Sequence, residues 1–145
     1  MNRLAGFVLF LGTSLAAQSI HSTLLALSDA TAPRARLTRQ LTDQMMALAK
    51  PDQIPGRVSV ERFSIELTAA LAGHDISASK ASAIERTISD LMRGNGATFL
   101  RANALWQTLG TCGVLPYKVQ TVVDAFVKIG QEIRGPDDSP VRNGK

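Results

Sequence analysis

One pair of side chains in this sequence has the types needed for covalent or redox chemistry. Cys112 is the only cysteine of the 145-residue chain, and His74 is one of two histidines. An imidazole beside a thiol can remove its proton and leave a nucleophilic thiolate, and a carboxylate such as Asp75 can orient the ring. If the fold brings these residues together, the sequence predicts a thiol-dependent enzyme or a redox-sensitive protein.

The surroundings of Cys112 also fit simpler interpretations. The local sequence Gly-Thr-Cys-Gly-Val matches neither a thiol-peptidase motif nor a CxxC redox motif. In the alternative interpretation, His74 is a solvated loop residue and Cys112 is a small apolar filler of the core. A lone thiol in an oxidising compartment can also join two chains into a structural dimer.

No metal or cofactor is expected. His74 and Cys112 are two potential ligands, which do not close a zinc site. The turns that hold them contain one carboxylate, Asp75, and a calcium loop needs several. The chain contains no GxSxG, no HExxH and no glycine-rich phosphate loop. Catalytic residues are therefore not assigned beyond the Cys112, His74 and Asp75 candidates.

A second candidate site is a cluster of positive charge formed by Arg34, Arg36 and Arg39. Such a cluster can contact acidic groups of a protein, a cell-wall polymer or anionic lipid headgroups, and a solvated helix face is the alternative. The whole chain has 16 Lys and Arg against 12 Asp and Glu, and 5% aromatic residues. This excess is small and stacking side chains are few, so we expect no nucleic-acid partner.

The elements that must position these residues are helices. Apolar residues recur at steps of three and four, and no segment alternates with a period of two. This pattern predicts an all-α fold, a small bundle of about five short amphipathic helices. The segment Ser19 to Ala30 is ambiguous, and we expect it to be helical. The other helices are expected at about 33–49, 60–72 with Ser59 as N-cap, 78–93 with Ser77 as N-cap, 97–109, and from Pro116 to about 134.

An internal repeat would bring the two candidate turns together. A shift of 38 residues places the apolar positions of 58–93 on those of 97–134, and it places His74 on Cys112. Two helical hairpins of this kind can bury each other's apolar faces, with their turns side by side. The alternative is that the match is chance, because any two amphipathic hairpins of equal length align in this way.

The apolar stripe of the first predicted helix also has two interpretations. Leu37, Leu41, Met45 and Leu48 lie on one face of the 33–49 helix, with Met46 beside them. If this helix packs against the hairpins, the stripe is core. If it does not pack, the stripe is an exposed apolar patch that marks an interaction surface.

The first seventeen residues have the pattern of a secretory signal peptide. Arg3 precedes an apolar run from Leu4 to Leu15, and small residues suited to cleavage follow at about 16–17. The run is shorter than the roughly 20 apolar residues of a membrane-spanning helix, and an uncleaved amphipathic anchor is the alternative. Cleavage would leave an N-terminal leader at 18–32, a helical domain at 33–134 and a tail at 135–145.

Together these features predict a periplasmic or secreted protein without enzymatic activity. We expect it to bind another protein or an envelope component through a helix face, with Arg34, Arg36 and Arg39 assisting. Contact with a membrane surface is compatible with this charge, and both a monomer and a dimer are compatible with the sequence. The thiol-dependent enzyme and the disulfide-linked dimer remain the alternatives.

Overall fold

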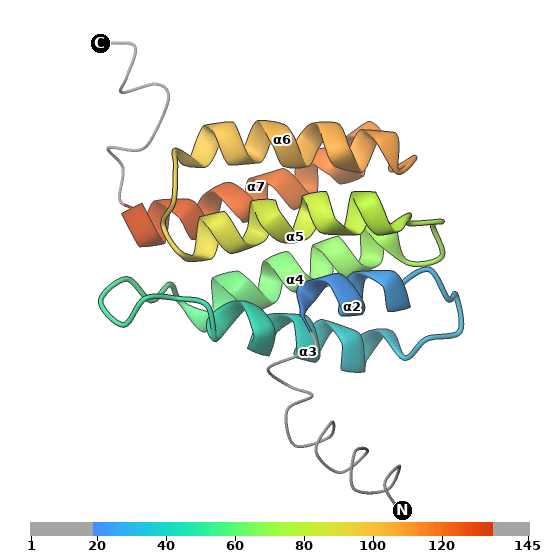
Figure 1. Ribbon diagram of the computed structural model, residues 1–145, viewed down its shortest axis with the longest axis horizontal. Helices are drawn as coiled ribbons and strands as arrows, with labels where there is room; N and C mark the ends of the chain where they lie inside the picture. The colour runs from blue at the N-terminus through green and yellow to red at the C-terminus, as the bar shows by residue number, and fades with distance from the viewer. Residues whose placement is uncertain (1–18, 135–145) are drawn as a thin grey trace, which may run out of the picture.

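The computed structural model describes residues 19–134, and within this range the chain forms six α-helices and no strand (Figure 1). The all-α prediction is therefore confirmed. The predicted signal peptide at 1–17 and the predicted tail at 135–145 lie outside the described residues. The helices are α2 (Ile20–Ala26), α3 (Arg34–Met46), α4 (Arg57–Leu71), α5 (Ala78–Met92), α6 (Thr98–Thr111) and α7 (Pro116–Arg134).

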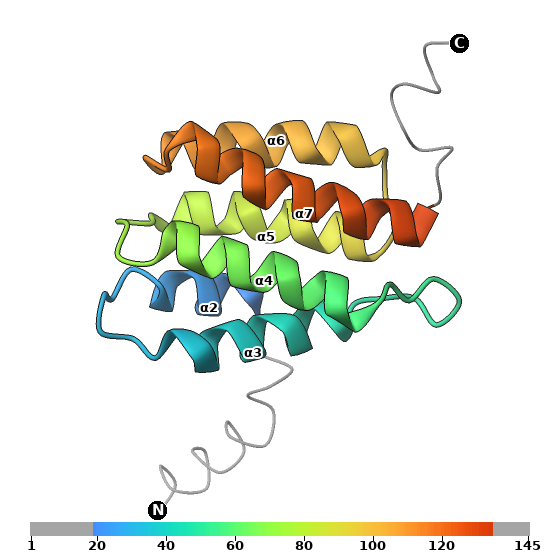
Figure 2. The same ribbon diagram turned by 180° about the vertical axis from the view of Figure 1, so that it is seen from behind.

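The six helices pack as two layers of three (Figures 1 and 2). In one layer α5 lies between α2 and α6, and in the other α4 lies between α3 and α7. Each layer buries its inner face against the other, which is how amphipathic helices satisfy their apolar sides. Because α4 is the middle helix of its layer, it has neighbours on both sides and one outer face.

The core lies between the layers and is apolar. Phe63 of α4 and Phe126 of α7 are fully buried, with ring centroids 5.7 Å apart and ring planes inclined by 54°. Leu37, Leu41 and Met45 of α3 are also buried, and Met46 and Leu48 are partly buried and packed against the core. The apolar stripe of this helix is therefore core, and the exposed-patch alternative for it is wrong.

The ambiguous segment from Ser19 to Ala30 contains helix α2. The N-terminal end of α2 has no side-chain cap of its own, and the Glu85 carboxylate of α5 accepts the backbone N–H of His21 at 3.2 Å. At its other end, the Leu27 carbonyl accepts the backbone N–H of Gly73 at 2.9 Å. Gly73 has a φ of +80°, a conformation that glycine adopts without strain. The helical expectation for this segment is confirmed.

Several predicted helix ends differ from the structure. Helix α3 begins after Pro33, which is its N-cap, and ends at Met46, three residues before the predicted end at 49. Helix α4 begins at Arg57 after Gly56, so Ser59 lies in its first turn and is not its N-cap. Helix α6 continues through Gly110 to Thr111, where the sequence predicted a turn. The chain turns instead at Gly113, which has a φ of +89°. The predicted N-cap of α5 is confirmed, because the Ser77 hydroxyl accepts the N–H of Lys80 at 3.3 Å.

The 38-residue relationship is present in part. Helices α5 and α7 begin at Ala78 and Pro116, which are 38 residues apart. The first helix of each hairpin also packs against the second helix of the other hairpin: α4 contacts α7, and α6 contacts α5. The two hairpins differ in how their own helices pack. In the second hairpin α6 packs closely on α7, whereas in the first hairpin α4 and α5 make their main contacts with other helices. Helix α5 packs on α2 and α4 on α3, and the second hairpin has no equivalent of these two contacts.

No helix between residues 19 and 134 has both the length and the apolar character needed to cross a membrane.

Candidate functional site

The two residues predicted as a chemical pair do meet. His74 lies in the turn between α4 and α5, and its Nδ1 is 3.1 Å from the backbone carbonyl oxygen of Cys112, the C-cap of α6. A carbonyl oxygen can only accept, so Nδ1 carries the hydrogen. The turns of the two hairpins are thus side by side, but this contact joins the ring to the peptide oxygen and not to the thiol.

A second side chain completes the same arrangement. The Lys80 ammonium, in the first turn of α5, donates to the carbonyl oxygen of Thr111 at 2.8 Å. The last carbonyl groups of a helix lack partners within the helix and carry the negative end of its dipole. His74 and Lys80 therefore cap the C-terminal end of α6, a structural role that sequence analysis did not assign to either residue.

The thiol itself is poorly suited to nucleophilic chemistry. The Cys112 residue is buried, and this burial raises the pKa of its thiol; the positive charge of Lys80 opposes the shift but does not cancel it. A nucleophilic cysteine needs a lowered pKa, so that the thiolate exists at neutral pH. Asp75 is exposed, and no hydrogen bond joins its carboxylate to the His74 ring. These features favour a structural role for the pair, and burial also makes the thiol hard for a second chain to reach.

No group of three His, Cys, Asp or Glu side chains suited to holding a metal ion occurs in the part of the chain that the structure describes.

The basic cluster has a different character. Arg34, Arg36 and Arg39 are all exposed on α3, and none forms an ion pair with another residue in the range 19–134. Three other arginines are neutralised: Arg57 pairs with Asp43, Arg62 with Glu66, and Arg101 with Asp90. The three cluster arginines thus present positive charge that no carboxylate of the described residues pairs with directly.

Two of these arginines border a groove between α3 and α4. The groove has a volume of about 680 Å³ and is lined by Arg34 and Arg39 together with Glu61 and Ile65 of α4. Small residues from both helices complete the lining: Ala35, Thr38, Thr68 and Ala69. The hydroxyls of Thr38 and Thr68 are 2.8 Å apart and link the two helices. Arg36 does not line this groove but a separate hollow on the surface of α3, with Asp43 and Gln44 among its neighbours.

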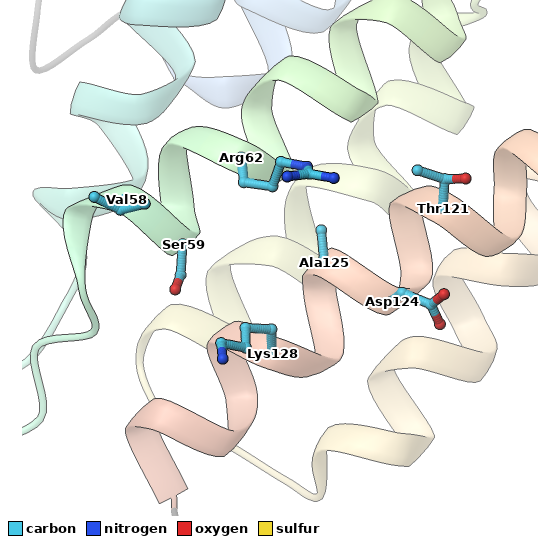
Figure 3. Close-up of a pocket in the computed structure, with 7 residues that line it drawn as sticks. All are labelled: Val58, Ser59, Arg62, Thr121, Asp124, Ala125 and Lys128. Carbon is cyan, nitrogen blue, oxygen red and sulfur yellow. The ribbon is translucent and has the colours of Figure 1, made fainter.

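A second groove lies on the other side of α4, between α4 and α7 (Figure 3). Its volume is about 410 Å³. Figure 3 shows the Arg62 side chain extending from α4 across the space above α7, with Lys128 and Asp124 on the facing helix. The lining residues are Val58, Ser59, Arg62, Thr121, Asp124, Ala125 and Lys128.

The ridge of α4 between the two grooves carries exposed apolar side chains. Val58 is 78% exposed and Ile65 is 49% exposed. They are seven residues apart, which is nearly two helical turns, so they lie on the same line along α4. We define the α4 face as this ridge with the cations beside it: Arg34, Arg39, Val58, Arg62, Ile65 and Lys128. The α4 face was not predicted, because apolar periodicity does not reveal which apolar residues stay uncovered.

Comparison with known protein families, with curated proteins and with solved structures finds no match to this chain. Its function has to be argued from the residues above.

Proposed function

We propose that this protein is an exported, non-enzymatic binding protein that contacts another protein or an envelope component through the exposed side of α3. The observation that carries the proposal is the exposed positive charge of Arg34, Arg36 and Arg39, none of which forms an ion pair within residues 19–134. Arg34 and Arg39 also line an open groove. Export rests on the signal-peptide pattern of residues 1–17.

The contrast between the arginines supports binding. Arg57, Arg62 and Arg101 each pair with a carboxylate, whereas Arg86 and Arg93 are exposed single arginines without an ion pair among the described residues. The arginines of α3 differ from these two because three of them lie within six positions of one helix. Three exposed arginines without such partners on one short helix form a local positive potential, which attracts and orients an acidic partner. The buried thiol and the capping role of His74 give the enzymatic alternative less support.

Crosslinking in native cells tests this proposal. The partners of the wild type are compared with those of the Arg34→Ala, Arg36→Ala, Arg39→Ala triple variant. A matched triple variant, Arg86→Ala, Arg93→Ala, Lys118→Ala, removes the same charge from exposed positions on α5, at its C-cap and on α7. We expect the first variant to lose partners that the second retains. An identical set of partners for all three proteins would exclude the α3 cluster as the binding surface.

The place of action has its own test. Mass spectrometry of the protein from native cells should show a chain that begins after about residue 16 or 17, outside the cytoplasm. An intact Met1 in the cytosol would overturn the export part of the proposal and leave the binding part to be judged by crosslinking.

A further inference from the structure

We infer that the partner presents an acidic, amphipathic helix that lies along the α4 face, between α3 and α7. The inference rests on the proposed function, because it names the chemistry of the partner that this side of the protein binds. It extends the contact from the three arginines of α3 to the ridge of α4 and the groove beyond it.

The apolar part of the contact is the ridge of α4. Val58 and Ile65 are separated by about 10 Å along the helix axis, at 1.5 Å per residue. Solvent-facing positions of a helix are normally polar, and Val58 and Ile65 place two β-branched side chains on one exposed line of α4. A partner helix with apolar residues at steps of three and four offers side chains at the same spacing, which is how helices dock into grooves.

The charges that flank this ridge are mainly positive. Arg34 and Arg39 lie on the α3 side and Lys128 on the α7 side, and none has an ion pair among the described residues. Arg62 reaches over the second groove but shares its charge with Glu66. A helix whose edges carry Asp or Glu on both sides of its apolar stripe would match these positions, because complementary charge fixes the orientation of a docked partner.

The same face fits an anionic membrane less well. Glu61 lines the first groove and Asp124 the second, so each groove holds a carboxylate that repels any negative group lying directly on it. A partner helix can place its few Asp and Glu residues beside the cations and away from these carboxylates, whereas a bilayer presents phosphates over its whole surface. Val58 lines the groove on one side of α4 and Ile65 the groove on the other, so a rod-shaped partner that lies along α4 would contact both side chains. A folded helix of another protein is therefore the occupant that the shape and charge favour.

Selection from a random peptide library displayed on phage tests the inference with the full mature chain as bait. Selected peptides are then synthesised, and their affinity is measured by fluorescence anisotropy. We expect apolar residues at helical spacing with Asp or Glu beside them. Affinity should fall about tenfold or more for each of two double variants, since a few central anchors carry most binding energy. One double variant is Arg34→Gln with Arg39→Gln, and the other is Val58→Ser with Ile65→Ser. Arg36→Gln, which removes a charge from outside the α4 face, should change affinity less than about twofold.

The outcomes separate this inference from the proposed function. Selected peptides without acidic residues, or peptides that bind the Val58→Ser, Ile65→Ser variant as well as the wild type, would overturn the inference. Binding to phosphatidylglycerol vesicles that depends on Arg36 as much as on Arg34 and Arg39 would also overturn it, while the proposed α3 contact would stand. If loss of all three arginines changes neither the crosslinked partners nor the affinity of the selected peptides, the proposed function fails as well.

Thermal unfolding of each variant is the control for folding. All the substituted positions are exposed, so each variant should keep the fold.

Discussion

The carboxylate of Glu132, near the end of α7, accepts the backbone N–H of Gly56 at 2.8 Å, although the two residues are 76 positions apart. Its other oxygen accepts the hydroxyl of Ser59. The N-terminal end of α4 has no side-chain cap from its own sequence, so a carboxylate from another helix satisfies its donors. A negative charge at this position also interacts favourably with the helix dipole.

Glu132→Ala should lower the free energy of unfolding by about 1 kcal/mol, as loss of an N-cap does, because the first turn of α4 would lose its acceptor. Chemical denaturation measures the change. Gln131→Ala, a neighbouring exposed position, is the control and should be near neutral. Equal stability of the two variants would mean that the Glu132 contact contributes nothing to the start of α4.

Two glycines inside helices should respond to alanine in opposite directions. Gly130 of α7 is buried, and a Cβ there would lie 2.9 Å from the Cβ of Thr98 and closer still to its γ atoms. Gly130→Ala should therefore destabilise the protein by about 1–3 kcal/mol, the cost of overpacking. Gly110 of α6 is exposed and has nothing within 4 Å of the added carbon. Gly110→Ala should stabilise by about 0.5–1 kcal/mol, since alanine is the better helix former.

Thermal unfolding of the two glycine variants checks this pair of predictions. A stabilising Gly130→Ala would show that α6 and α7 can separate at this point without cost, contrary to their close approach in the structure.

The Cys112 thiol should react with a thiol reagent more slowly than free glutathione at neutral pH. Burial raises the pKa of this thiol, so the folded protein holds the proton more tightly than the unfolded chain does. The associated stability is therefore fully present below the ordinary thiol pKa and is lost as the pH rises through the raised value. Labelling rates measured against pH, with and without denaturant, test both statements. Fast labelling of the folded protein at neutral pH would restore the thiol-dependent alternative.

His74→Ala should destabilise the protein by about 1 kcal/mol, because the Cys112 carbonyl loses a partly buried hydrogen bond. Lys80→Met should have a smaller effect, since its ammonium is partly exposed and water can replace it. Lys118→Met is the control: it occupies the position equivalent to Lys80 after the 38-residue shift, but its side chain is exposed and forms no hydrogen bond with a described residue. Chemical denaturation of the three variants should rank them in this order. An unchanged His74→Ala protein would remove the capping role of the ring.

The amino-acid sequence by itself determined the all-α class, the buried stripes and most of the helix positions. Val60, Phe63 and Leu67 recur at helical spacing, and they are buried because a helix can bury only one face against a single opposing layer. Ser77 and Pro116 marked helix starts correctly for local reasons, since a hydroxyl cap and a fixed φ act within one turn. The expected position of His74 beside the Cys112 turn followed from two hairpins of matching length.

The tertiary structure alone decided the start of α4, the role of His74 and the presence of the α4 face. Glu132 caps α4 from another helix, and no local pattern near Gly56 records that contact. His74 and Cys112 were correctly brought together, but which atoms meet depends on how the two turns pack. Val58 and Ile65 are apolar residues whose exposure depends on which helices neighbour α4. Periodicity specifies the face that a helix buries, whereas the partners of its remaining surface are set by contacts between segments far apart in the chain.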